Sequence, residues 1–149
     1  MKRRAERITA LKILYALEFN PTGIEEQIDL YKTNIQEEVS EFAIDIIKTT
    51  IKNRDELDEL IKSQLHNWDF NRVSVIDKVL LRMALTELKY FPDVPAEATL
   101  NEVIEISKDF STERSGKFIN GILDAILKKI NPNHEKNKLK KKADQEKKK

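Results

Sequence analysis

Three arginines near the N-terminus are the residues whose type and spacing best suit a chemical task. Arg3, Arg4 and Arg7 occur at positions i, i+1 and i+4 of a predicted helix, so Arg3 and Arg7 share a face that Arg4 borders. Guanidinium groups bind phosphate through paired hydrogen bonds and stack on bases, and single-stranded RNA sites combine them with aromatic side chains. The cluster suggests RNA binding, although many helices begin with arginines that only face solvent.

The sequence offers little that could perform catalysis or hold a metal ion. Only two histidines are present, His66 and His134, and the absence of cysteine excludes disulfides and thiolate metal sites. No Gly-rich phosphate loop, nucleophile motif or metal-ligand spacing occurs, and most carboxylates stand beside lysines at the spacing of exposed helix faces. We therefore predict that the protein is not an enzyme and needs no cofactor or metal.

The charge is unevenly distributed along the chain, although its formal net charge is only +1. Residues 1–12 carry a net charge of +4 and residues 131–149, with eight lysines, carry +5, so the segment between them carries −8. Basic ends suit contact with an anion, and an acidic body suits a basic partner. A solvated helix start and a disordered tail are the alternative interpretation of the two basic ends.

The composition favours a compact helical domain. Of the 149 residues, 40% are hydrophobic and 36% charged, and only three glycines and four prolines interrupt the chain, whereas β-sandwiches need many turns. No apolar run approaches the ~20 residues that span a bilayer. No unbroken apolar segment follows the basic N-terminus, as it would in a signal peptide. We expect a cytoplasmic protein with no membrane contact.

Apolar residues that recur every three or four positions predict helices along most of the chain. The predicted ranges are about 4–19, 24–31, 37–52, 55–65, 72–90, 99–108 and 112–130. Asp55 is expected to cap the fourth helix, and Thr99 with Glu102 forms a capping box for the sixth. Ser111 or Thr112 is expected to cap the last helix.

The predicted fold class is all-α, with two packed three-helix bundles. The helical domain covers residues 1–130, with sub-bundles at about 1–67 and 68–130. Residues 131–149 have almost no apolar content, so we expect a disordered lysine-rich tail. Gly121 lies inside an unbroken helical pattern, and we interpret it as a close contact between helices.

Several motifs follow one another in a recognisable order. Residues 68–88 contain a Trp, a short gap and a predicted helix with Asp, Leu-Arg and Glu-Leu. Residues 95–108 contain a Pro followed by a predicted helix that contains Asn-Glu. Residues 117–124 read Lys-Phe-Ile-Asn-Gly-Ile-Leu-Asp. With Arg4, Ala5, Arg7, Leu14 and Tyr15 in the first helix, these motifs resemble the bacterial transcription antitermination factor NusB family over about residues 3–130.

The resemblance implies a fold of two three-helix bundles and a role in transcription antitermination. It implies binding to boxA, a short single-stranded element of ribosomal RNA operon transcripts, with NusE, which is also a small-subunit ribosomal protein. The pair would load onto RNA polymerase as part of an antitermination complex. The RNA contacts that it implies here are Arg3, Arg4, Arg7, Lys117 and Phe118. Val103 stands where the family usually has alanine, and the lysine-rich tail is an addition.

Other interpretations of these residues stay open. A NusB-like domain also begins certain ribosomal RNA cytosine methyltransferases, but we expect no methyl-donor-binding domain after residue 130. A helical protein-interaction module in ribosome assembly, without direct RNA contact, is the alternative function. Asp77 and Glu87 are candidates for docking the basic partner NusE, and internal helix-to-helix bonds are an equally supported role for both. Trp68 suits a core position better than a platform for a base.

Overall fold

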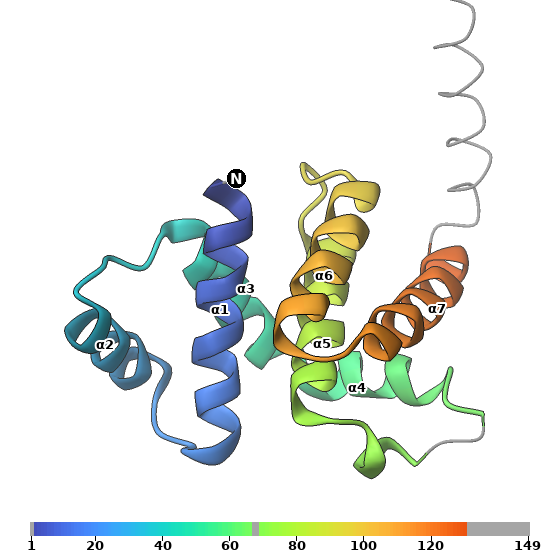
Figure 1. Ribbon diagram of the computed structural model, residues 1–149, viewed down its shortest axis with the longest axis horizontal. Helices are drawn as coiled ribbons and strands as arrows, with labels where there is room; N and C mark the ends of the chain where they lie inside the picture. The colour runs from blue at the N-terminus through green and yellow to red at the C-terminus, as the bar shows by residue number, and fades with distance from the viewer. Residues whose placement is uncertain (1, 67–68, 131–149) are drawn as a thin grey trace, which may run out of the picture.

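The computed structural model describes residues 2–66 and 69–130, which are helical and contain no strand, as the sequence predicts (Figure 1). The elements are α1 (Lys2–Phe19), α2 (Ile24–Ile35), α3 (Glu41–Lys52), α4 (Arg54–Lys62), a 3₁₀ turn η1 (Phe70–Arg72), α5 (Val75–Tyr90), α6 (Ala96–Phe110) and α7 (Glu113–Ile130). Within these ranges, no helix has the length and apolarity to cross a bilayer. Trp68 and the predicted disordered tail lie outside the described residues.

Helix α5 is the centre of the fold. All residues from Val79 to Glu87 are buried, as expected for a helix that is apolar around most of its circumference. It contacts α1, α3 and α4 from the first half of the chain and α6 and α7 from the second (Figure 1). One cluster of buried apolar residues runs through both halves. Because the two halves share this core, the predicted division into two sub-bundles near residue 67 stays a prediction.

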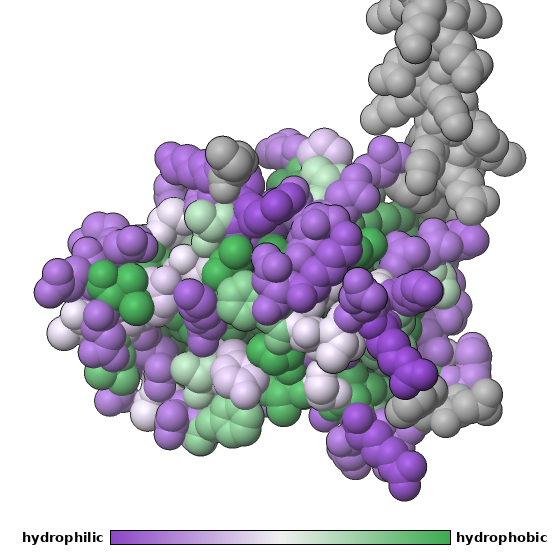
Figure 2. Space-filling model, viewed as in Figure 1, coloured by the Kyte–Doolittle hydropathy of each residue, from purple (hydrophilic) through white to green (hydrophobic). Residues whose placement is uncertain are grey.

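Hydrophilic side chains cover much of the outer surface of the helices, and apolar side chains show mainly between them (Figure 2). Inside, a buried arginine joins three helices. Arg82 of α5 donates two hydrogen bonds to Asp58 of α4, at 2.6 and 3.1 Å, and one to Glu18 of α1, at 2.6 Å. This network joins α5 to α1 and α4 through polar contacts.

Three helices, α3, α5 and α7, begin with hydroxyl caps that stabilise free backbone N–H groups. Ser40 Oγ accepts a hydrogen bond from the Ala43 amide at 3.2 Å, so α3 starts four residues later than predicted. Thr112 Oγ1 accepts from the Ser115 amide, also at 3.2 Å, which confirms Thr112 of the two predicted caps for α7.

Two other capping predictions are wrong. Helix α4 begins directly after Asn53, which places Asp55 inside its first turn. Helix α6 begins directly after Pro95, whose φ of −61° suits a helix start, so the proposed capping box lies within the helix. Thr99 is buried there, and Glu102 points to α1. The two side chains that could have formed the capping box are bound instead by residues of other helices, Thr99 by Glu87 and Glu102 by Arg4.

The close helix contact predicted at Gly121 is also wrong. A Cβ atom at Gly121 would meet nothing within 4 Å, because this face of α7 is exposed. The close approach occurs one turn earlier, at Gly116. A Cβ atom there would lie 3.5 Å from Ser107 Oγ and 3.7 Å from Ile104 Cγ2, both on α6.

The two glycines of α7 should therefore respond differently to substitution. Gly121→Ala should stabilise the protein by about 0.5–1 kcal/mol, because glycine costs this much inside a helix. Gly116→Leu should lower the melting temperature, because atoms beyond Cβ meet α6 and overpacking costs about 1–3 kcal/mol. Thermal unfolding followed by circular dichroism measures both changes. Equal responses of the two variants would contradict this packing.

Candidate nucleic-acid interface

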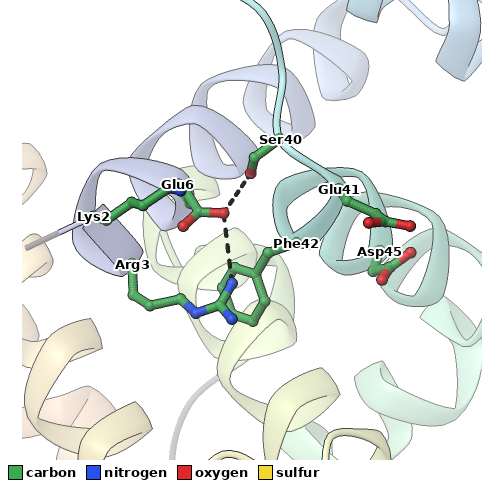
Figure 3. Close-up of a pocket in the computed structure, with 7 residues that line it drawn as sticks. All are labelled: Lys2, Arg3, Glu6, Ser40, Glu41, Phe42 and Asp45. Atoms are coloured by element: carbon green, nitrogen blue, oxygen red, sulfur yellow. Dashed lines mark hydrogen bonds and ion pairs between the residues drawn. The ribbon is translucent and has the colours of Figure 1, made fainter.

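Arg3 lies exposed on the first turn of α1 and faces α3 (Figure 3). Its guanidinium carbon is 3.9 Å from the centre of the Phe42 ring, and its Nη1 is 3.5 Å from the Glu6 carboxylate. Glu6 also accepts a hydrogen bond from Ser40 at 2.5 Å. These four residues line a cavity of about 480 Å³. Because the Arg3 side chain is 59% exposed, its head group is held in place and still reaches solvent.

Arg4 is exposed on the same turn but is tied to α6. Its Nε and Nη2 donate to the two oxygens of Glu102 at 2.7 and 2.9 Å. The hydrogen bonds and charge of Arg4 hold the pKa of the Glu102 carboxyl below its ordinary value. The carboxylate is therefore ionised at neutral pH, and a phosphate must compete with it for the guanidinium.

Arg7 lies in the core, away from the surface that we predicted for it. Its side chain is 3% exposed, and its Nε and Nη2 donate to the two oxygens of Glu87 at 2.9 and 2.7 Å. Thr99 of α6 donates to the same carboxylate at 3.0 Å. Because its side chain is buried and bound to Glu87, we propose a structural role for Arg7.

The sequence contained a signal for this burial. Arg7 stands three and four residues before Ala10 and Leu11, which are both buried on the inner face of α1. A residue at that spacing continues the apolar face by one turn. We grouped Arg7 with Arg3 and Arg4 because all three are positively charged. The position of each residue around the helix axis decides which of them face the core.

Lys117 and Phe118 lie on α7, at a second location. Lys117 is exposed, and Phe118 is half-buried and packs partly against the core. Phe118 lines a cavity of about 580 Å³ between α7 and the start of α5. Of the predicted RNA contacts, Arg3 lines the cavity at α1 and α3 and Phe118 lines the cavity between α7 and α5, so the structure does not gather them in one site.

The two predicted partner-docking residues have different environments. Glu87 is buried and engaged by Arg7 and Thr99, so it is not accessible to a partner. Asp77 is 7% exposed, and its Oδ2 accepts a hydrogen bond from Ser115 at 2.9 Å. Its Oδ1 is buried without a hydrogen-bond partner among the described residues, and Asp77 lines the cavity beside Phe118. A buried acceptor without a donor is costly and often has a functional explanation.

Phe42 and Glu102 are the members of this surface that sequence reasoning missed. Each meets an arginine of α1 from a helix far away in the chain, and the capping-box pattern that contains Glu102 gives no sign of its contact with Arg4. Among residues 2–66 and 69–130, no cluster of three or more His, Cys, Asp or Glu side chains could hold a metal ion. The arrangement is that of a binding surface with exposed cations and aromatic rings.

Residues 4–128 match the NusB family. The transcription antitermination protein NusB of Acetivibrio thermocellus is 38% identical over 130 residues, which cover 86% of this chain and 90% of the relative. A solved NusB structure from T. maritima is 38% identical with a TM-score of 0.76, covering 85% of this chain and 90% of that one. A structure of the antitermination factors NusB and NusE with double-stranded RNA shares the fold, at 22% identity, a TM-score of 0.76 and coverage of 85% and 96%.

The structural role of Arg7 is open to a direct test. Arg7→Gln should lower the free energy of unfolding by about 3–5 kcal/mol, because it leaves the Glu87 carboxylate buried and unpaired. Arg4→Gln is the matched control, since it removes an ion pair that is equally bidentate but exposed to solvent. This variant should change the urea midpoint of unfolding little. Urea denaturation measures both. Similar small losses would show that Arg7 does not hold the helices together.

Proposed function

The chain belongs to the NusB family, and from this premise we propose that it is a transcription antitermination factor that binds RNA. We propose boxA-type single-stranded RNA of ribosomal RNA operon transcripts as its target, NusE as its protein partner and the RNA polymerase antitermination complex as its site of action. This role would place it in the cytoplasm. The observation that carries the proposal is the pair of exposed guanidinium groups, Arg3 and Arg4, on the first turn of α1.

The proposed RNA surface consists of Arg3, Arg4, Lys117 and Phe118. Arg3 is positioned over an aromatic ring, and Arg4 is positioned by a carboxylate in the two-pronged geometry that also suits a phosphate. Exchange of Glu102 for a phosphate is feasible because solvent-exposed ion pairs are weak. Lys117 adds a third exposed positive charge, and Phe118 offers an aromatic surface.

The relatives support the same classes of partner. NusB of Acetivibrio thermocellus is named a transcription antitermination protein, and a protein of this fold has been solved together with NusE and RNA. These names agree with the prediction that the chain is not an enzyme. The choice of single-stranded boxA over other RNA comes from the resemblance of the sequence and is part of our proposal.

Titration of labelled boxA-type RNA tests the proposed function. Single strands lose affinity with a salt slope of roughly −0.7 per neutralised phosphate, so contacts by Arg3, Arg4 and Lys117 predict a slope near −2. Arg4→Gln should weaken binding and make the slope shallower by about 0.7. Arg54→Gln is the control, because Arg54 is another exposed arginine paired with a carboxylate. A protein-interaction module without RNA contact would show no binding, or equal affinity for both variants.

Asp77 remains our candidate for docking NusE. The unpartnered Oδ1 can accept a hydrogen bond from a lysine or arginine of a basic partner, and the opposite charges would steer the encounter. Ribosomal proteins are typically basic, and residues 13–130 carry a net charge of −8. Since Glu87 is buried and paired, we no longer include it in the docking surface.

Asp77→Asn separates docking from a structural role. If Asp77 binds the partner, this nearly isosteric change should weaken the NusE complex by about 2–5 kcal/mol. The melting temperature of the free protein should stay unchanged or rise, because a buried charge is removed. Asp93→Asn, on an exposed loop, is the control. Calorimetric titration and a thermal melt measure the two quantities, and a lower melting temperature with unchanged partner affinity would assign Asp77 to the core alone.

A further inference from the structure

The guanidinium group of Arg3 is the outermost member of a column of side chains from three parts of the chain. At the inner end, the ring of Phe91, which follows α5, meets the Phe42 ring of α3 edge to face, with ring centres 5.8 Å apart. The guanidinium carbon of Arg3 lies over the Phe42 ring, 3.9 Å from its centre. Phe42 is half-buried and Arg3 is exposed. The column therefore leads from the core to solvent, where it ends in a planar cation.

A second contact holds this guanidinium group over the ring. The Glu6 carboxylate lies 3.5 Å from Arg3 Nη1 and accepts a hydrogen bond from Ser40, directly before α3. Figure 3 shows these contacts beside the ring of Phe42. Since Phe42 covers one face of the guanidinium and Glu6 approaches its edge, the opposite face is left to solvent. The exposure of 59% of the Arg3 side chain agrees with this geometry.

The charges around the guanidinium group suit a nucleobase better than a phosphate. The adjacent cavity, of about 480 Å³, is lined by the carboxylates of Glu6, Glu41 and Asp45 and by the cations Lys2 and Arg3. Its charged side chains thus sum to −1, and the carboxylates repel a phosphate that enters. A base is neutral, and its amino groups donate hydrogen bonds to carboxylates, as cytosine does to Glu and Asp. The volume lies within the ~300–1,000 Å³ typical of ligand sites.

We propose that the guanidinium of Arg3 is a platform on which an unpaired RNA base stacks, and that Phe42 is the positioning residue that holds this platform in place. The proposal rests on the RNA-binding function proposed above and adds a physical source of preference for single strands. Guanidinium planes stack on unstacked bases, and a base inside a duplex does not offer its face. The base adds the next layer to the column, while the strand's phosphates lie outside the acidic cavity, towards Arg4.

This role depends on the planar shape of the Arg3 head group and not on its charge alone. Lysine carries the same charge on a compact ammonium group that has no flat face. A positive charge attracts single and double strands alike, because both carry phosphates. A stacking platform raises the affinity for single strands only. The ratio of the two affinities therefore separates stacking by Arg3 from simple attraction of phosphate.

Charge-conserving variants test the platform in titrations of labelled boxA-type RNA, as a single strand and as a duplex of the same length. Arg3→Lys should weaken single-strand binding by about fivefold, the effect of one weak stacking contact. The affinity for the duplex and the salt slope should not change, because the charge is kept. Arg54→Lys is the matched control, since Arg54 is exposed and paired with Glu18, and it should change neither affinity.

Variants of Phe42 show whether the ring acts through Arg3. Phe42→Leu should reproduce the loss for single strands, and Phe42→Tyr, which keeps the ring, should bind like the wild type. Arg3→Lys/Phe42→Leu should lose no more affinity than Arg3→Lys alone, because both changes remove one and the same platform. Thermal melts measure the packing that Phe42→Leu also removes. Arg3→Lys changes an exposed residue, so it tests the platform even if Phe42→Leu does not fold.

Nuclear magnetic resonance gives a readout that a packing role does not move. On addition of single-stranded RNA, the Arg3 Hε signal should move upfield in the ring current of the stacked base, and the duplex should not have this effect. Equal losses for single strand and duplex in Arg3→Lys would show that Arg3 only attracts phosphate. An unchanged affinity ratio in a less stable Phe42→Leu would make Phe42 a packing residue alone. Either result overturns the proposal while the proposed function stands, and a wild type that binds no RNA overturns both.

Discussion

The buried ion pair between Arg7 and Glu87, completed by the Thr99 hydroxyl, is the interaction on which the rest of the arrangement depends. It joins α1, α5 and α6 at one point, with both charges removed from solvent and three hydrogen bonds to a single carboxylate. Such a pair adds little net stability over apolar side chains, but removal of one member is costly, because the other stays buried and charged. Its geometry sets how α1 crosses the other two helices. The direction in which the first turn of α1 projects beyond the core follows from that crossing.

The remaining arginines differ in what they can offer a ligand because of their partners. Arg82 is buried and saturated by Asp58 and Glu18, so it can only hold helices together. Arg4 is exposed and paired, and is thus positioned for a phosphate that displaces Glu102. Arg72 and Arg114 are exposed without an acidic neighbour in the described part of the chain. The formal net charge counts all of these arginines alike. Burial of the side chain and neutralisation by a nearby carboxylate decide which of them can bind a partner.

The cavity beside Phe118 is the place where the proposals for RNA and for protein meet. Its rim is cationic, one wall is aromatic, and its deepest charged group is a carboxylate with one free oxygen. An RNA backbone and a basic side chain prefer different parts of such a site, so both can be bound close together.

The sequence by itself determined the all-helical class, the number and approximate ranges of the helices and, through its motifs, the family. Those properties follow from local periodicity and residue order, which can be analysed without knowing which helices pack together. It also indicated an arginine cluster at the start of α1, in which the structure finds Arg7 buried, and it misplaced the capping box at Thr99. Only the tertiary structure showed these contacts, because Glu87, Glu102 and Phe42 reach the first two turns of α1 from distant parts of the chain. Helical phase indicates which side chains of a helix face the core, but local sequence patterns do not encode which distant residue each charged side chain will meet.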